Sequence, residues 1–190
     1  MERHFFDLTI DVYVPGRWYF KTPTTPEGQP LDDPWSFTNG EPIAPPGRLR
    51  IPLSRAGSPL DFTSAGVGLT PILSERAAAV FRDMALRDIQ LFPAEVEGQA
   101  EPYFLLVVSR TVRCIDDGAS EEVRLWTPEH GRPEKVGQYR HVSGLRIDTS
   151  KVGDERVFRP WGLPSALIVD GELKAALERT GIVGGRFVAV

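Results

Sequence analysis

The sequence predicts an α+β domain with a mainly antiparallel sheet, two principal helices and a long proline-rich irregular segment near the N-terminus. Three observations lead to this fold class. Many short segments are apolar or alternate apolar and polar residues between turn residues, which is typical of antiparallel strands. Only two segments have the capped, amphipathic pattern of a helix. Finally, 11 of the 17 prolines lie between Pro15 and Pro71, where they disfavour continuous sheet or helix.

The first 68 residues combine one predicted strand with the proline-rich segment. From Phe6 to Val14, apolar residues occupy every second position, so we expect a strand with one buried face. Pro15-Gly16 turns the chain, and short strands such as 49–53 can interrupt the irregular structure that follows. Because 190 residues suffice for one sizeable core, we expect a single domain, 1–190, divided into this first part and a second part, 69–190.

The two predicted helices begin at capping residues. Ser74 caps a helix that runs to about Leu86, and Asp170 caps a shorter one. Gly181 is expected to end the second helix in a left-handed conformation, before a last strand at 186–190. In both helices, apolar residues recur at helical spacing and predict the buried face. These residues are Ala77, Val80, Phe81 and Met84 in the first helix, and Leu173, Ala176 and Leu177 in the second.

The other strands are predicted from apolar runs bounded by turn residues. The longest candidate is 103–115, and Asp116-Asp117-Gly118 supplies a turn after it. A meander of antiparallel strands is the natural interpretation, because consecutive strands joined by tight turns pair with each other. The remaining candidates are 89–96, 122–126, 139–147 and 166–169.

Composition and charge argue against several classes of protein. No apolar run approaches the roughly 18 residues of a membrane span, and the first residues lack the pattern of a signal peptide. We therefore expect a cytoplasmic protein. A net charge of −4 disfavours a nucleic-acid binder and is compatible with a basic protein partner. Cys114, the single cysteine, continues the apolar phase of its strand, which predicts a buried small hydrophobe.

No motif indicates catalysis, a cofactor or a metal. The histidines His4, His130 and His141 lack the spacing of a helical zinc site. No serine lies in a Gly-x-Ser-x-Gly elbow, and a triad assembled from distant residues stays open. The stretch 66–68, Gly-Val-Gly, lacks the Gly-Lys-Ser/Thr ending of a phosphate loop and is interpreted as a turn. These observations favour recognition of another macromolecule.

Two acidic turn regions are candidate contact sites for a protein partner. The first contains Asp32, Asp33 and Trp35; alternatively, Trp35 pins the loop to the core and the carboxylates lie in water. The second region surrounds the predicted hairpin. Its four carboxylates would repel one another at close range, so they are either spread in water or available to a basic ligand. They are Asp116, Asp117, Glu121 and Glu122.

Five short blocks carry a resemblance to a known family. In this order, they resemble bacterial immunity proteins of polymorphic toxin systems, the myxobacterial type formerly described as a domain of unknown function. Together they span about 69–190, and the proline-rich part is matched only loosely. The blocks are 71–75 (PILSE), 88–96 (DIQLFPAEV), 103–107 (YFLLV), 164–169 (PSALIV) and 184–188 (GGRFV).

The resemblance implies a non-enzymatic cytoplasmic protein that binds and neutralises a cognate toxin encoded next to it, without a cofactor. We expect the two acidic turn regions to contact that toxin, because acidic groups speed encounter with a basic partner and aromatic residues supply buried anchors. Two alternatives remain. One is a small-molecule-binding or hydrolytic domain with a pocket under the proline-rich segment, in which polar groups with shifted pKa values would converge. The other is a structural subunit of an assembly.

Overall fold

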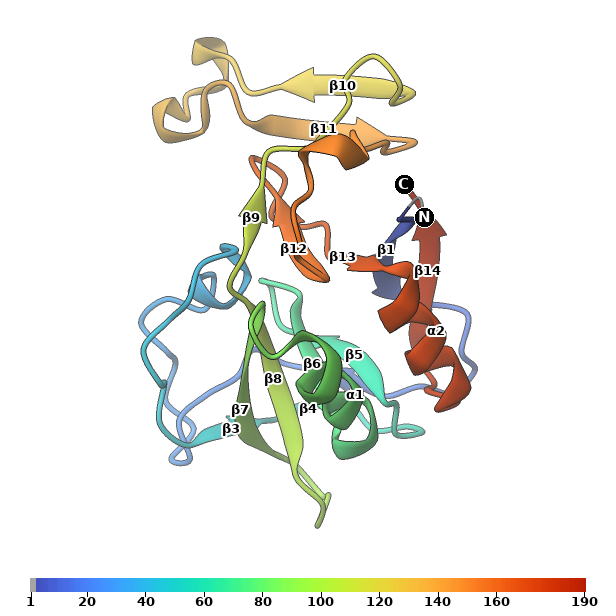
Figure 1. Ribbon diagram of the computed structural model, residues 1–190. Helices are drawn as coiled ribbons and strands as arrows, with labels where there is room; N and C mark the ends of the chain where they lie inside the picture. Colours follow the sequence, from blue (N-terminus) through green and yellow to red (C-terminus); the bar gives the residue numbers. More distant parts are fainter. Residues whose placement is uncertain (1–2) are drawn as a thin grey trace.

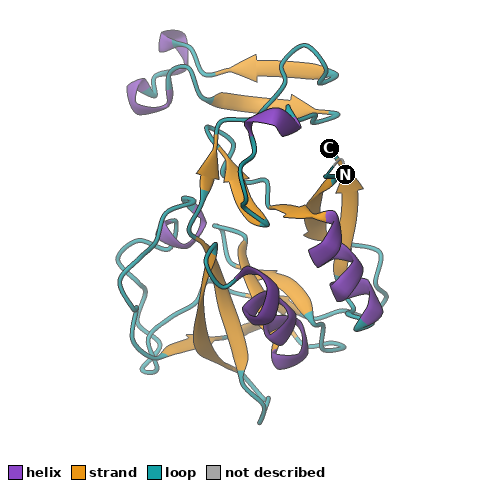
Figure 2. Cartoon of the chain, viewed as in Figure 1, coloured by secondary structure: helices purple, strands orange, loops and turns teal. Residues whose placement is uncertain are grey.

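The computed structural model describes residues 3–190 and shows an α+β fold in which two helices pack against mixed sheets (Figures 1 and 2). The helices are α1 (Glu75–Ala85) and α2 (Gly171–Arg179). The largest sheet contains, in spatial order, β3 (Leu49–Ile51), β7 (Ile89–Val96), β8 (Tyr103–Val108), β6 (Thr70–Ser74), β5 (Phe62–Ala65), β2 (Tyr19–Phe20) and β4 (Leu53–Arg55). The second contains β14 (Gly185–Ala189), β1 (Phe5–Ile10), β13 (Ile168–Asp170), β12 (Val157–Pro160) and β9 (Thr111–Val112).

The seven-stranded sheet curls into a nearly closed barrel. Its two edge strands, β3 and β4, are consecutive in the sequence and only Pro52 separates them, so the chain itself joins the two edges. Proline has no N–H group to donate to a neighbouring strand, which suits it to this corner. Glu97 secures the seam, because its amide donates to the Ile51 carbonyl at 3.1 Å and its carboxylate accepts from the Leu53 amide at 2.9 Å.

Strand β8 shows how the barrel buries both faces of its sheet. Leu105 and Val107 point into the barrel, where they pack with Trp18, while Leu106 and Val108 point to the opposite face. Successive side chains of a strand alternate between faces. Because both faces are buried, the strand consists of the continuous apolar run YFLLVV.

The two helices cover the outer face of the barrel and join it to the five-stranded sheet (Figure 1). Ser74 caps α1 by accepting a hydrogen bond from the Ala77 amide, and Asp170 caps α2 by accepting one from the Leu173 amide, as the sequence predicts. Gly181, at φ 68°, follows the end of α2. The cluster under the helices includes Leu8, Leu73, Phe81, Leu106, Val169, Leu173 and Leu177.

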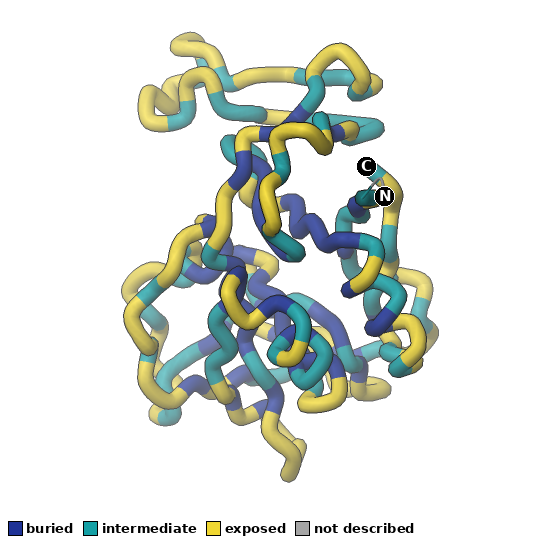
Figure 3. The backbone as a smooth tube through the Cα atoms, in the orientation of Figure 1, coloured by how far each residue is buried: buried dark blue, intermediate teal, exposed yellow. Residues whose placement is uncertain are grey.

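The third sheet is a hairpin that extends from the body. Strands β10 (Glu122–Leu125) and β11 (Tyr139–Ser143) pair antiparallel, and their connection contains the 3₁₀ turns η2 (Pro128–His130) and η3 (Pro133–Lys135). In Figure 3 this arm lies above the body, and every residue of 122–143 is at least partly exposed. We call 121–143 the arm. It lacks a buried core of its own, so its shape depends on backbone pairing and polar contacts.

Several boundaries differ from the sequence prediction. The expected strand 103–115 is two strands, because the chain leaves the barrel after β8 and β9 pairs in parallel with β12. Cys114 therefore packs with Phe158 and Ile168, and not on the face of Leu106. The first strand ends at Ile10, and Val12 is exposed. Parallel pairs also join β2 to β5 and β3 to β7, so the sheets are mixed.

Candidate functional site

The loop containing Asp32, Asp33 and Trp35 presents its side chains to solvent. Asp33 accepts a hydrogen bond from the Trp35 amide at 3.0 Å, and its carbonyl accepts one from the Ser36 hydroxyl at 2.8 Å. This local turn leads into the 3₁₀ turn η1 (Ser36–Thr38). Both carboxylates are exposed. The side chain of Asp33 stabilises the backbone of its own turn, as is typical of aspartate in turns. This turn holds the backbone of Trp35 in place.

The Trp35 side chain is exposed and does not anchor the loop. It is 54% exposed, whereas Phe37, two residues later, is 2% exposed and packs with the barrel core. The interpretation of Trp35 as the pinning residue is therefore wrong, and Phe37 has that role. An indole held outward on an anchored turn is the kind of side chain that dominates binding energy in protein interfaces.

The segment around this loop contains the whole net charge of the protein. Residues 22–47 include Glu27, Asp32, Asp33 and Glu41 and no lysine, arginine or histidine. Since the chain has 26 acidic and 22 basic residues, the rest of the chain has 22 of each and is neutral. In Figure 1 this segment forms the blue loops along the left side of the barrel. A charge count by segment would have revealed this asymmetry from the sequence.

Most of the hairpin carboxylates are engaged within the protein. Asp116 accepts from the amides of Gly118 and Ala119 at 3.0 Å, which closes the turn before the arm. Asp117 accepts from the Tyr139 hydroxyl at 2.7 Å. Burial, together with this contact to Asp117, raises the pKa of Tyr139 to about 12. These two carboxylates thus hold the base of the arm.

The other two carboxylates lie at the start of β10. Glu122 accepts from Arg124 Nε at 2.7 Å, and the second oxygen of its carboxylate lies 3.7 Å from His141 Nε2. Glu121 is exposed. The residues of 121–143 include four acidic side chains and four lysines or arginines, so the arm as a whole is neutral. The four carboxylates therefore do not form an isolated acidic cluster, because three of them accept hydrogen bonds from nearby residues. Among residues 3–190, their hydrogen bonds do not reach the Asp32 loop, which holds its own turn.

The arm also groups cationic side chains around an aromatic ring, which the sequence analysis missed. The Trp126 ring centroid lies 5.2 Å from Lys135 Nζ and 5.7 Å from Arg140 Cζ, and His130 packs against it edge-on at 5.6 Å. His130 follows Trp126 by four residues, whereas Arg140 belongs to β11 and approaches the ring only because β11 pairs with β10. They stabilise the arm without a buried core.

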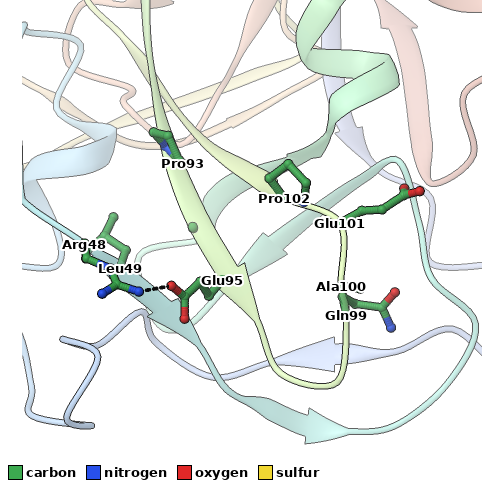
Figure 4. Close-up of a pocket in the computed structure, with 9 residues that line it drawn as sticks. Arg48, Leu49, Pro93, Glu95, Gln99, Ala100, Glu101 and Pro102 are labelled. Carbon is green, nitrogen blue, oxygen red and sulfur yellow. Dashed lines mark hydrogen bonds and ion pairs between the residues drawn. The ribbon is translucent and has the colours of Figure 1, made fainter.

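The hollow beside the proline-rich segment is too small for the predicted small-molecule pocket. It measures about 220 Å³ and lies between β3 and the turn that follows β7 (Figure 4). Its charged pair, Arg48 and Glu95, forms an exposed ion pair at 2.5 Å across one side. Pockets for drug-sized ligands occupy about 300–1,000 Å³. The geometry of this hollow therefore disfavours a small-molecule site under the segment.

A larger cavity of about 880 Å³ lies at the N-terminus of α2. Its charged groups neutralise one another, since the buried carboxylate of Asp170 pairs with Arg3 and Arg156, and Arg156 also pairs with Glu172. No three His, Cys, Asp or Glu side chains of residues 3–190 are grouped so that they could hold a metal ion. In the same part of the chain, no helix is long and apolar enough to cross a membrane.

Cys114 is expected to resist thiol reagents in the folded protein. It is completely buried, and burial raises the pKa of its thiol to about 11 from 9.0, which lowers the thiolate fraction near neutral pH about 100-fold. Reaction with an aromatic disulfide reagent should therefore begin only when the chain is unfolded in guanidinium. Rapid, stoichiometric reaction of the native protein would contradict this burial.

Comparison with known proteins places most of the chain in one family model. The model described as Immunity protein family (Imm11) matches residues 22–190. The match therefore begins within the proline-rich segment and includes the Asp32 loop, whereas the sequence resemblance covers only 69–190. A search of curated proteins finds no match.

Proposed function

Because the chain belongs to the Imm11 immunity protein family, we propose that it covers its toxin with two exposed regions, the Asp32 loop and the arm. As a member of this family, it binds and neutralises a cognate toxin and is not an enzyme. Its effect on the toxin therefore comes from binding energy and surface complementarity. The remaining question is which surface makes contact.

The observation that supports the Asp32 loop best is the combination of localised charge and an exposed indole. Residues 22–47 account for the whole net charge of −4, and Trp35 extends from the same segment. Acidic groups around a large aromatic side chain favour a basic partner surface, because the charges steer encounter and the ring supplies buried contact area. We propose Asp32, Asp33 and Trp35 as toxin contacts.

The arm is proposed as a second, weaker contact region. Asp116 and Asp117 support its base, and Glu121 and Glu122 lie where the arm leaves the body. Since the arm carries balanced charge, we propose that these four carboxylates contribute mainly by presenting the arm to the toxin, with Glu121 available for a direct ion pair. A charged pair at an exposed rim adds little affinity by itself.

The setting of this function is proposed from the family. We propose that the toxin gene lies next to the gene for this protein, because toxin and antidote must be inherited together. We further propose that 1–190 fold as one domain and act in the cytoplasm of the producing cell. The shared cluster between the barrel, the helices and the five-stranded sheet supports a single folding unit.

Co-purification tests the proposed function. The protein, expressed with an affinity tag, is expected to retain the product of the neighbouring gene in a one-to-one complex that survives extensive dilution. Co-expression is expected to restore growth to cells that produce the toxin. A matched variant, Trp35→Ala, should retain less toxin at the same expression level. If the neighbouring product neither binds nor arrests growth, the assignment of that partner is wrong.

A further inference from the structure

The turn between β5 and β6 presents two apolar side chains to solvent, one on each side of Gly68, which lies against the Trp35 loop. Val67 is 65% exposed and Leu69 is 58% exposed, although the residues before and after this turn are buried. The turn is closed by a hydrogen bond from the Leu69 amide to the Gly66 carbonyl at 3.3 Å. Burial would be the favourable state for both side chains. The fold instead exposes them to solvent, in the turn that joins the antiparallel strands β5 and β6.

The backbone of this turn is under strain at Leu69. Its φ is 49°, and Leu69 is the non-glycine residue with positive φ in residues 3–190. A bulky side chain in the left-handed region is a genuine outlier, because Cβ crowds the following carbonyl. Glycine would adopt this conformation without the penalty. Strain of this kind persists where the surrounding structure enforces it, and it is concentrated at binding sites.

Neighbouring contacts fix the position of the turn. Gly66, at φ 65°, packs so closely on Thr22 that a Cβ atom there would lie 2.4 Å from the Thr22 hydroxyl oxygen. A Cβ atom built on Gly68 would lie 3.2 Å from the Pro34 carbonyl oxygen and 3.7 Å from Cε3 of Trp35. The turn therefore lies directly against the Asp32 loop. We define the apolar patch as Trp35, Val67 and Leu69.

The charge around the apolar patch selects the kind of partner. Asp32 and Asp33 border it and belong to the segment 22–47 that contributes a net charge of −4. A second copy of this chain, docked symmetrically, would place this acidic segment against itself, which like-charge repulsion opposes. A partner with an apolar pocket bordered by lysines or arginines would satisfy both features.

We infer that the apolar patch is the principal anchor for the toxin and that it inserts into an apolar pocket bordered by basic side chains. This inference rests on the proposed function and extends it from Trp35 to Val67 and Leu69, in a turn that carries no chemical motif. Three apolar side chains on two hydrogen-bonded turns lose less conformational freedom on binding than side chains on an unstructured loop, because the folded backbone already presents them to solvent. The acidic border excludes other partners and speeds encounter with a basic surface.

Leu69→Gly separates binding from folding. Glycine removes the exposed side chain and also relieves the positive φ, so the variant should unfold at the same temperature as the wild type or higher. Its Kd for the purified product of the neighbouring gene should nevertheless rise at least about tenfold, as expected for a central anchor. Leu69→Asn is the second variant, since asparagine also tolerates this conformation and lacks the apolar side chain.

Leu86→Ala is the matched control. Leu86 is 64% exposed and follows the end of α1, so this variant removes a similar amount of exposed apolar surface elsewhere. Its Kd should equal that of the wild type. The double variant Asp32→Asn/Asp33→Asn should slow association several-fold and reduce its dependence on salt. An unchanged association rate would contradict the role of the acidic border.

The outcomes distinguish the inference from the function on which it rests. If the wild type binds the toxin and both Leu69 variants bind equally well, the apolar patch is not the anchor, although the protein remains a toxin inhibitor. If Leu86→Ala weakens binding as much as the Leu69 variants do, the effect is not specific to the patch and the inference also fails. If the wild type does not bind the product of the neighbouring gene, the proposed partner is wrong, and the inference is lost with it.

Discussion

Phe81→Ala is expected to lower the free energy of unfolding by about 3–5 kcal/mol. Phe81 is completely buried in the middle of α1 and belongs to the cluster that joins the barrel to α2 and the five-stranded sheet. Truncating it removes a large apolar surface from the interior and leaves a cavity inside this shared cluster. Chemical denaturation monitored by circular dichroism measures the change.

The control for this prediction comes from the end of the same helix. Leu86→Ala removes an exposed leucine side chain and should change the free energy of unfolding by less than about 0.5 kcal/mol. Because the cluster includes residues of both large sheets, Phe81→Ala should also keep a single cooperative transition. Two separate transitions would show that the sheets do not share one core. A decrease in the free energy of unfolding no larger than that of Leu86→Ala would contradict the role of Phe81 in that core.

Asp61→Ala is expected to lower the free energy of unfolding by about 2 kcal/mol. Asp61 accepts from the Ser74 hydroxyl at 2.7 Å, from Arg76 Nη2 at 2.5 Å and from the Val183 amide at 2.9 Å. One carboxylate thus joins the barrel, the start of α1 and the chain that follows α2. Alanine leaves these donors without their partner, although solvent around the half-exposed Arg76 weakens the ion-pair share of the loss.

The effect of Asp61→Ala should depend on pH. Burial opposes ionisation, but hydrogen bonds from Arg76, Ser74 and Val183 outweigh it and lower the pKa of Asp61. A carboxylate with a lowered pKa stabilises the fold above its unfolded pKa, about 3.9, and loses this contribution as the pH falls through its folded pKa. The difference between wild type and variant should therefore be full at neutral pH and shrink below about pH 4.

Asp154→Ala is the matched control for charge. Asp154 forms an ion pair with Arg87 at 2.8 Å, and this contact lowers its pKa too. Both side chains are exposed, so solvent screens their attraction and the stability should scarcely change. Urea denaturation of both variants at neutral and acid pH provides the comparison. If Asp61→Ala were no more destabilising than Asp154→Ala at neutral pH, the bridging role of Asp61 would be refuted.

The two helices were predictable because their signals are local. Ser74 and Asp170 each cap a helix by accepting from the amide three residues later, and both signals lie within one turn of the sequence. Phe81 and Leu177 are buried as helical spacing predicts. The burial of Cys114 was also confirmed, although its neighbours differ from those expected, because the chain changes sheets after β8.

The candidate site was less predictable, because exposure and proximity depend on distant segments. The sequence singled out Asp32, Asp33 and Trp35 but could not distinguish an anchoring indole from an exposed one. The structure assigned the anchor to Phe37. At the hairpin, the sequence showed four carboxylates, whereas two of their partners, Tyr139 and His141, lie on β11 and become neighbours only when the chain folds back along β10.

The sequence by itself therefore determined the α+β class, both helices with their caps, the family, and the absence of a catalytic motif, since each of these follows from short-range patterns or from ordered blocks. Only the tertiary structure decided that β3 and β4 close a barrel through Pro52 and that the turn of Leu69 lies against Trp35. The physical reason is that strand partners and surface neighbours are set by burial of the whole chain, and local pattern does not specify which distant segments meet.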